Sequence, residues 1–205
     1  MMHKIGLTGG ICTGKTFVLN LLEEFGCYTI RADDIAREII FSADSPVLQK
    51  IKEKFGEDIY DEKQGIKKDP FTRILFEDVE KRNFINKIVH PLVTTEREKK
   101  FKDIQETDLY AFFIYESALM VEAGTYKDFE KIIVVYASQE EQMKRLVERD
   151  RISREEAEKK IKSQFPLSEK LKVAHYTIDT TGSFESAKAK TQETFYLMKK
   201  DFNIE

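Results

Sequence analysis

The chain has 205 residues and a mass of 24.0 kDa, a length that allows one α/β domain or a core domain with a helical insert. Hydrophobic residues make up 41% of the sequence and charged residues 35%, a balance typical of a globular chain with a charged helical surface. The net charge of -3 and the pI near 5.8 argue against capture of nucleic acid, which needs clustered positive charge.

The numbers of cysteines and histidines and the hydropathy of the sequence indicate which metal sites and which cellular location to expect. Two cysteines and three histidines are too few for a disulfide framework or a zinc cluster. No apolar run is long enough to span a bilayer, and the opening stretch MMHKIGLTGG lacks the apolar core of a signal peptide. We therefore expect a cytoplasmic protein with no nucleic-acid, membrane or obligatory protein partner.

Short apolar runs alternate with stretches of helical period along the chain, which indicates βα organisation. The helix expected after Lys15 ends before Gly26. The longest apolar runs are continuous rather than alternating, as in parallel strands covered on both faces. The sequence predicts a three-layer α/β/α fold with a five-stranded parallel sheet, whose strands are 4–8, 27–30, 108–116, 131–137 and 176–179.

The stretch between the second and third strands is polar and almost entirely helical in pattern. It is too long for a plain crossover, so we expect a single domain with a core at 1–34 and 107–205 and a helical insert at about 35–106. Later in the chain, Ser138 and Ser153 each stand three residues before a glutamate. This spacing is that of a capping box and predicts that helices begin after both serines.

The stretch LTGGICTGKTF, residues 7–17, carries the clearest motif. Gly9, Gly14, Lys15 and Thr16 satisfy G-x-x-x-x-G-K-S/T between a predicted strand and a predicted helix, the context that a phosphate-binding loop requires. Glycines let the backbone turn its N–H groups inward around a phosphate, at the positive end of the helix. The alternative is a glycine-rich turn that binds nothing. The predicted ATP-binding residues are Gly9, Gly10, Ile11, Cys12, Thr13, Gly14, Lys15, Thr16 and Phe17.

Two side chains of this loop have expected roles of their own. Lys15 would contact the terminal phosphates as a point charge, and the Thr16 hydroxyl would bind the Mg²⁺ that bridges them. ATP as co-substrate and Mg²⁺ as cofactor are therefore expected.

The next candidate follows the second strand, in the stretch RADDIAREII. Asp33 and Asp34 come at the carboxyl end of a parallel strand, the edge at which α/β sheets bind ligands. A carboxylate there could take the proton from an attacking hydroxyl or hold the waters of the metal. The alternative is that Asp33 is only the N-cap of the following helix.

A local group of arginines lies late in the chain. Arg145 and Arg149 are one turn apart on a predicted helix, and Arg151 and Arg154 follow. Such a cluster could clamp the negative charge of a transferring phosphoryl group. The alternative is a solvated helix whose arginines pair with nearby glutamates.

Several motifs together resemble those of the dephospho-CoA kinases, a family of P-loop kinases related to nucleoside monophosphate kinases. The matching stretches are LTGGICTGKT, RADDIARE, HPLV at 90–93, ERD at 148–150, Gln164 and AHYTIDTTG from 174. The resemblance covers nearly the whole chain. It implies ATP-dependent phosphorylation of the ribose 3'-hydroxyl of dephospho-CoA, with Asp33 as general base. It also implies that the helical insert binds CoA and that residues 145–164 form a mobile lid, called here the lid segment.

The resemblance extends to substrate contacts. It raises the possibility that His90 contacts the phosphate or ribose of the substrate, although Pro91 after it favours a plain helix start capped by His90. Arg37 and Arg73 are weaker candidates of the same kind. Glu116, at the end of the third strand, could face the water shell of the metal or be a surface residue. The catalytic set is thus Asp33, Lys15, Arg145 and Arg149, and the substrate-binding set is Asp33, Arg37, Arg73, His90 and Glu116.

Five positions depart from the family pattern. The family usually has glycine at Cys12, threonine at Phe17, aspartate at Arg31 and His175, and asparagine at Thr181. At Cys12, a Cβ must tolerate the dihedral angles of the loop, or the loop must bend differently. None of these changes removes a group that the expected chemistry needs.

Three other functions compete with this interpretation. A GTPase-type switch would explain DTTG at 179–182, but that element ends the last strand instead of lying early beside the phosphate loop. A P-loop kinase of another small alcohol or nucleoside differs only in its substrate. A nonenzymatic module would bind ATP tightly without turning it over.

Overall fold

The computed structural model describes residues 1–61, 65–108 and 111–204. They form two compact units, the first made of Met1–Ile30 and Asp108–Glu205 and the second of Arg31–Thr107. The first unit carries the phosphate loop and the lid segment, and the second contains the predicted insert.

The main sheet has five strands in the order β2-β5-β1-β6-β7. β1 pairs in parallel with β5 and β6, and β6 pairs in parallel with β7. The predicted α/β fold with its five-stranded sheet is confirmed, with small shifts at strand ends. The strands are β1 (His3–Gly9), β2 (Tyr28–Arg31), β5 (Phe112–Glu116), β6 (Lys131–Tyr136) and β7 (Tyr176–Asp179). Residues 109 and 110 of the predicted third strand lie outside the described residues.

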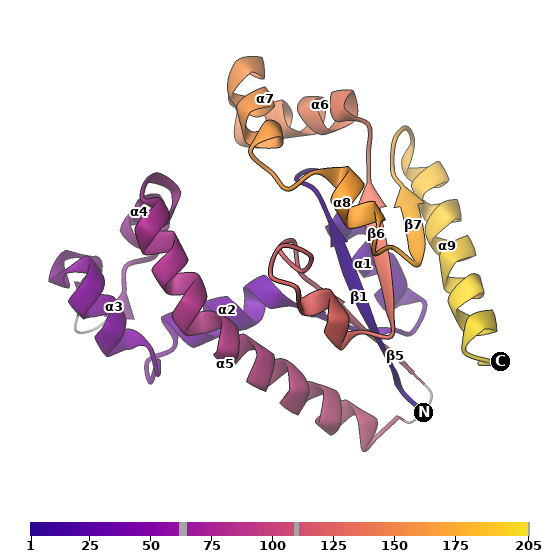
Figure 1. Cartoon of the computed structure of the whole chain (residues 1–205), viewed down its shortest axis with the longest axis horizontal. Coiled ribbons are helices and arrows are strands. Elements are labelled where there is room, and N and C mark those ends of the chain that lie inside the picture. The colour runs from indigo at the N-terminus through magenta and orange to yellow at the C-terminus, as the bar shows by residue number, and fades with distance from the viewer. Residues whose placement is uncertain (62–64, 109–110, 205) are drawn as a thin grey trace. The chain divides into compact units, whose positions relative to one another are not determined.

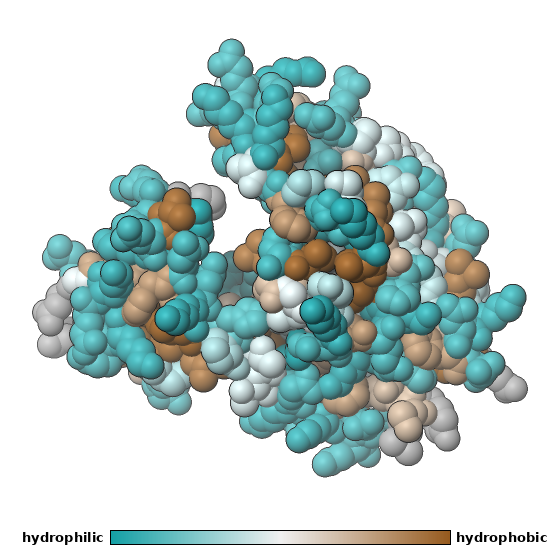
Figure 2. All heavy atoms as spheres, in the orientation of Figure 1, coloured by the Kyte–Doolittle hydropathy of each residue, from teal (hydrophilic) through white to brown (hydrophobic). Residues whose placement is uncertain are grey.

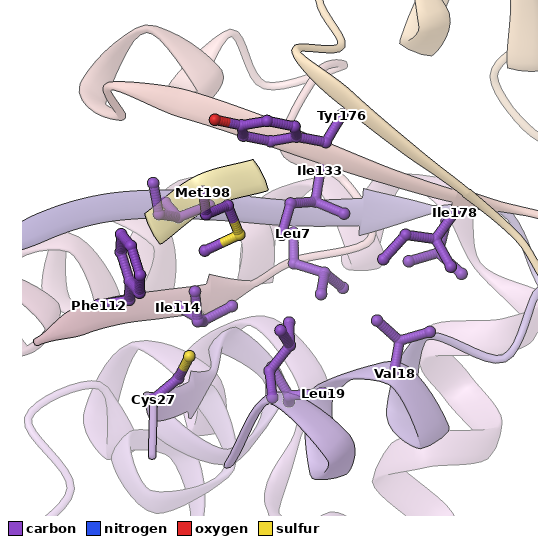
Figure 3. Packing of buried hydrophobic residues seen from close by; sticks show 13 residues of the cluster. Leu7, Val18, Leu19, Cys27, Phe112, Ile114, Ile133, Tyr176, Ile178 and Met198 are labelled. Carbon is purple, nitrogen blue, oxygen red and sulfur yellow. The ribbon is translucent and has the colours of Figure 1, made fainter. Parts of the chain in front are cut away.

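Both faces of the central strands are buried, as the continuous apolar runs predict. Figure 3 shows Leu7, Ile114 and Ile133, from three strands, turned toward Val18 and Leu19 of the following helix. Successive side chains of a strand point to opposite faces, so Gly6 lies on the other face, where a Cβ would crowd the Met120 sulfur at 2.6 Å. Helices on one face and the segment after β5 on the other keep both faces from water.

Helices of the first unit surround this sheet. α1 (Lys15–Glu24) and α9 (Phe184–Asp201) supply buried residues to the core of Figure 3. Figure 1 shows α6 (Gln139–Asp150) and α7 (Arg154–Lys162) beyond the carboxyl ends of β1 and β6. α8 (Leu167–Leu171) follows, and a short 3-10 helix, η2 (Thr125–Asp128), precedes β6.

The predicted helix starts after Ser138 and Ser153 are confirmed. Ser138 accepts a hydrogen bond from the backbone of Glu141, and Ser153 and Glu156 form a full capping box. These caps satisfy N–H groups that have no partner inside a helix. Figure 2 shows mostly hydrophilic side chains over α7, as expected for a helix with one narrow apolar face.

The second unit is mainly helical, as the pattern predicts, and it also contains a hairpin that the pattern did not reveal. β3 (Tyr60–Asp61) and β4 (Gly65–Ile66) pair antiparallel. Phe71 is buried here and contacts the rings of Phe41 and Phe55. The helical elements of this unit are α2 (Ala32–Phe41), α3 (Leu48–Phe55), η1 (Glu57–Ile59), α4 (Lys68–Glu77) and α5 (Val79–Gln105).

The expected helix start at Pro91 is wrong, because Pro91 lies inside α5. A proline in a helix interior removes one backbone hydrogen bond. The buried stripe of Ile85, Val89 and Val93 continues past it at helical spacing, so packing stabilises the helix on both sides. His90 is consequently a mid-helix residue with an exposed side chain, and its predicted cap role is excluded.

Candidate active site

The phosphate loop joins β1 to α1. Two of its positions require glycine, each for a different steric reason. A Cβ at Gly9 would collide with the Val135 carbonyl oxygen on the neighbouring strand. Gly14 occupies the N-cap position of α1 with a φ of 81°, a left-handed conformation that side chains disfavour. The loop therefore turns tightly into the helix N-terminus, where backbone N–H groups can bind an anion.

Lys15 lies back over the start of this loop. Its ammonium group donates hydrogen bonds to the carbonyl oxygens of Gly9 at 3.1 Å and Gly10 at 2.8 Å. Thr13 closes the loop from within, since its hydroxyl donates to the Gly10 carbonyl oxygen at 3.0 Å. The positive charge is thus held within the loop, beside the amides that would bind phosphate.

A cavity of about 550 Å³ brings the loop together with the lid-segment arginines. Its lining consists of Cys12, Thr13, Gly14, Lys15, Thr16, Arg145, Glu148 and Arg149. Three positive side chains and a helix N-terminus facing one cavity favour a polyphosphate ligand. Thr16 is exposed in the first turn of α1, and its hydroxyl is a hard oxygen ligand of the type that Mg²⁺ prefers. The described residues contain no cluster of three or more His, Cys, Asp or Glu side chains that could bind a metal by themselves.

Arg145 is fixed by contacts with two other segments. Its guanidinium donates to the Thr180 carbonyl oxygen at 2.7 Å, to the Thr180 hydroxyl at 3.1 Å and to the Cys12 carbonyl oxygen at 3.4 Å. Glu141, one turn earlier on α6, accepts from its Nε at 2.9 Å. These hydrogen bonds therefore hold the Arg145 guanidinium in one position at the edge of the cavity.

Arg149 is more exposed and has a different partner. Its Nε donates to Asp150 Oδ1 at 2.8 Å, and 57% of its side chain is exposed. This hydrogen bond lowers the pKa of Asp150 from its ordinary value, and Lys160 lowers it further. Arg149 thus forms an ion pair with an acidic neighbour and also lines the cavity beside the phosphate loop. The two interpretations of this arginine, an ion pair and a phosphate clamp, are therefore compatible. Arg154 is the first residue of α7 and Arg151 ends α6 in a left-handed conformation.

Cys12 accommodates the loop by adopting the left-handed conformation that glycine would take, with a φ of 53°. Its side chain and that of Ile11 pack against an apolar cluster of Met143, Leu146 and Ala157. Burial raises the pKa of the Cys12 thiol, while the charges of Arg149, Lys15 and Arg145 oppose that increase. The residue that replaces a family glycine is therefore a contact between the phosphate loop and the lid segment.

The other departures in the first unit have structural partners. The Phe17 ring meets Phe184 edge-on, with centroids 5.3 Å apart. His175 Nδ1 accepts a hydrogen bond from the Ile132 amide at 3.1 Å. Thr181 Oγ1 accepts one from the Ser138 amide at 2.8 Å. Phe17 and Thr181 thus stabilise the starts of helices near the site, whereas His175 lies at the amino ends of β6 and β7.

The candidate residues of the second unit are all solvent-accessible. Asp33 is exposed in the first turn of α2, and Arg37 is exposed one turn later, so they share a helix face. The N-cap of α2 is Arg31, so the expectation that Asp33 caps the helix is wrong. Arg73 on α4 and His90 on α5 are exposed as well.

Glu116 is the last residue of β5 and is only 9% exposed. It stands opposite Leu7 in the register of β1 and β5. The interpretation of Glu116 as a surface residue is therefore wrong, and a buried carboxylate lies at the ligand-binding edge of the sheet.

Two residues that sequence reasoning did not single out prove central to the first unit. Thr180 is 2% exposed and bonds both the phosphate loop and Arg145. Its place just after the last strand, at the carboxyl edge, could have identified it. Lys170 is also 2% exposed, and no sequence signal separates it from the many surface lysines.

The chain is similar to known proteins over most of its length. The family model described as dephospho-CoA kinase matches residues 3–186. The dephospho-CoA kinase of Aquifex aeolicus is 36% identical over 200 residues, covering 98% of this chain and 100% of that protein. That of Carboxydothermus hydrogenoformans is 40% identical over 184 residues, covering 90% and 88%.

Solved structures support the fold. The dephospho-CoA kinase from Campylobacter jejuni aligns with a TM-score of 0.73 at 24% identity, covering 98% of this chain and 99% of that chain. A shikimate kinase from Acinetobacter baumannii has the same general fold, with a TM-score of 0.55 at 17% identity. The family model matches most of the sequence, and the two relatives are more than 30% identical to this chain over most of its length. The chain belongs to the dephospho-CoA kinase family.

Proposed function

We propose that the protein transfers the γ-phosphoryl group of ATP to the ribose 3'-hydroxyl of dephospho-CoA, giving CoA and ADP in the last step of CoA biosynthesis. One observation carries the proposal: Lys15, Arg145 and Arg149 face a single cavity with the phosphate loop, in a chain of this family. An exposed phosphate site with converging cations suits transfer through a charged transition state.

The residues of the first unit would bind and orient ATP. Backbone amides at the start of α1 hold the phosphates, and Lys15 moves its ammonium group from the carbonyl oxygens of Gly9 and Gly10 to the terminal phosphates. Arg149, which is more exposed than Arg145, would contact the phosphoryl group during transfer, while Arg145 stabilises the nucleotide from a fixed position. Closure of the lid segment would exclude water and limit hydrolysis of ATP.

Mg²⁺ is the cofactor we propose, held by the Thr16 hydroxyl and the phosphates. It would neutralise charge on the phosphate oxygens during transfer. Glu116, buried at the end of β5, is the proposed partner of its water shell.

The acceptor would be prepared by the second unit. Asp33 is the proposed general base that accepts the proton of the 3'-hydroxyl, and its exposed side chain is accessible to a ligand. Arg37, on the same face of α2, and the exposed Arg73 and His90 are proposed to bind the phosphates or ribose of dephospho-CoA. We propose the helical insert, residues 35–106, as the CoA-binding part. Two cysteines and no disulfide pattern make the cytoplasm the proposed location.

The test is an ADP-release assay with ATP, Mg²⁺ and one acceptor at a time: dephospho-CoA, adenosine, gluconate or shikimate. We expect release with dephospho-CoA alone, and a product whose mass and ³¹P spectrum match CoA. Release with another acceptor would favour a kinase of a different alcohol. Tight ATP binding without release for any acceptor would favour a nonenzymatic module.

A further inference from the structure

A side chain at the end of the lid segment is hydrogen-bonded to the phosphate loop. The amide oxygen of Gln164 accepts a hydrogen bond from the Ile11 backbone N–H at 2.6 Å. Gly10 makes this approach possible, because a Cβ there would be 3.3 Å from Gln164 Oε1 and 3.2 Å from Gln142 Oε1. A neutral amide oxygen thus satisfies a backbone N–H of the loop.

The segment that presents Gln164 is anchored at its other end. Lys170 on α8 is 2% exposed, and its ammonium group donates to the Ala118 carbonyl oxygen at 2.7 Å and to Glu122 at 2.8 and 2.9 Å. A buried cation with three acceptors is costly to displace. Pro166, the N-cap of α8, further limits the backbone between the two anchors. Gln164 is therefore held in place before any ligand binds.

An apolar contact joins the same part of the loop to the lid helices. Ile11 and Cys12 pack against Met143 and Leu146 of α6 and Ala157 of α7. The hydrogen bond of Gln164 and this apolar contact both act on the turn at residues 11 and 12. Arg145 and Arg149 are carried by the same α6.

The Gln164 contact lies outside the nucleotide cavity. Gln164 and Gly10 line a different cavity, of about 780 Å³, which shares Thr13 alone with the cavity that Lys15, Thr16 and the arginines line. In this arrangement the ATP phosphates would bind the amides of residues 12–17, while the Ile11 amide, which the loop motif places among the ATP-binding residues, stays bonded to Gln164. The hydrogen bond supports the loop and does not compete with phosphate.

We infer that Gln164 is a positioning residue that couples the lid segment to the phosphate loop and remains bonded to Ile11 while nucleotide is present. Through this bond it keeps Arg145 and Arg149 of α6 in place opposite Lys15, across the cavity that the three side chains line. The inference rests on the proposed ATP-dependent activity, but its first test requires only binding of nucleotide.

That test is hydrogen exchange of the Ile11 amide, followed by ¹⁵N NMR on the whole chain. In the unchanged protein the amide should be protected both without nucleotide and with a non-hydrolysable ATP analogue and Mg²⁺. Gln164→Met keeps a similar side-chain length without the acceptor, and should make exchange about fivefold to tenfold faster, the effect of one ordinary hydrogen bond. Gln164→Glu restores an acceptor oxygen and should restore protection. Glu158→Gln, on a half-exposed lid-segment residue paired with Lys162, is the matched control and should change nothing at Ile11.

Two results would overturn the inference. One is an Ile11 amide that exchanges equally fast in the unchanged protein and in Gln164→Met. The other is protection that disappears when the analogue binds, since Gln164 would then compete with the nucleotide.

Steady-state kinetics provides the functional measurement. Gln164→Met should lower kcat/KM for ATP about fivefold to tenfold, with KM for dephospho-CoA within about twofold of the unchanged protein and an unchanged circular dichroism spectrum. A rise in KM for dephospho-CoA as large as the loss in kcat/KM for ATP would indicate general damage and would contradict a positioning role. If no acceptor is phosphorylated at all, the proposed function fails, while the exchange experiment still decides the role of Gln164.

Discussion

The Thr180 hydroxyl donates a hydrogen bond to the Thr13 carbonyl oxygen across 2.8 Å. This bond ties the segment after β7 to the phosphate loop. Because Arg145 donates to the hydroxyl and the carbonyl oxygen of the same threonine, one buried residue links the loop, the last strand and the lid segment.

Thr180→Val should weaken this junction while keeping the shape of the side chain. The Thr13 carbonyl oxygen would lose its donor and Arg145 one of its acceptors, so we expect a loss of about 1–3 kcal/mol in the free energy of unfolding. Chemical denaturation measures that loss. kcat/KM for ATP should fall as well, because Arg145 loses part of its support. An unchanged unfolding free energy would show that the hydrogen bond contributes nothing net.

Asp33→Asn should leave ATP affinity nearly unchanged and reduce kcat about a hundredfold or more, the usual contribution of a general base. Calorimetry with an ATP analogue and single-turnover transfer to dephospho-CoA measure the two quantities separately.

Asp34→Asn is the matched control for Asp33. Asp34 is also exposed and stands 3.8 Å from Arg31, a surface pair that contributes little. We expect near-normal kcat for Asp34→Asn. Near-normal kcat for Asp33→Asn as well would remove Asp33 from the mechanism.

Lys15→Met should reduce transfer by about a hundredfold or more, since a positioned charge at the phosphates acts mainly on the transition state. The fold should survive, because Lys15 is only partly buried and its side chain donates to carbonyl oxygens of its own loop, those of Gly9 and Gly10. Circular dichroism and thermal melting check the fold alongside the transfer assay. A folded Lys15→Met protein with normal transfer would contradict the assignment of the phosphate loop.

The two cysteines should differ in alkylation. Burial raises the pKa of Cys12 above its ordinary value of 9.0, and raises that of Cys27 to about 12. The reactive thiolate is therefore minor at pH 7. Iodoacetamide should label Cys12 more slowly than a free cysteine peptide, with a rate that rises about tenfold per pH unit between pH 7 and pH 8.

Peptide mass spectrometry measures labelling at each site. ATP with Mg²⁺ should slow labelling of Cys12, which lines the nucleotide cavity. Cys27, in the core shown in Figure 3, should be labelled only after unfolding. Faster labelling of Cys12 than of the peptide at pH 7 would mean that its arginine neighbours outweigh its burial.

The sheet and the phosphate loop could be predicted from the sequence because their signals are local and agree with one another. Continuous apolar runs predicted the central strands. Ser153 and Glu156 predicted the start of α7, where the structure has their capping box. A glycine-rich stretch between strand and helix permits few other conformations.

The remaining features depend on contacts between distant segments. Pro91 carries a local signal for a helix start, yet the stripe from Ile85 to Val93 packs the helix through it. Lys170 is buried because Ala118 and Glu122 accept from it, and neither is near it in sequence. The contact of Gln164 with Ile11 likewise joins residues that no sequence pattern relates.

The 780 Å³ cavity beside Gln164 offers a route to selective inhibition. A compound that fills it need not resemble a nucleotide, because Lys15, Thr16 and the two arginines of the phosphate site do not line this cavity. A compound that breaks the bond between Gln164 and Ile11 would reduce activity by disturbing the phosphate loop rather than by occupying a substrate site.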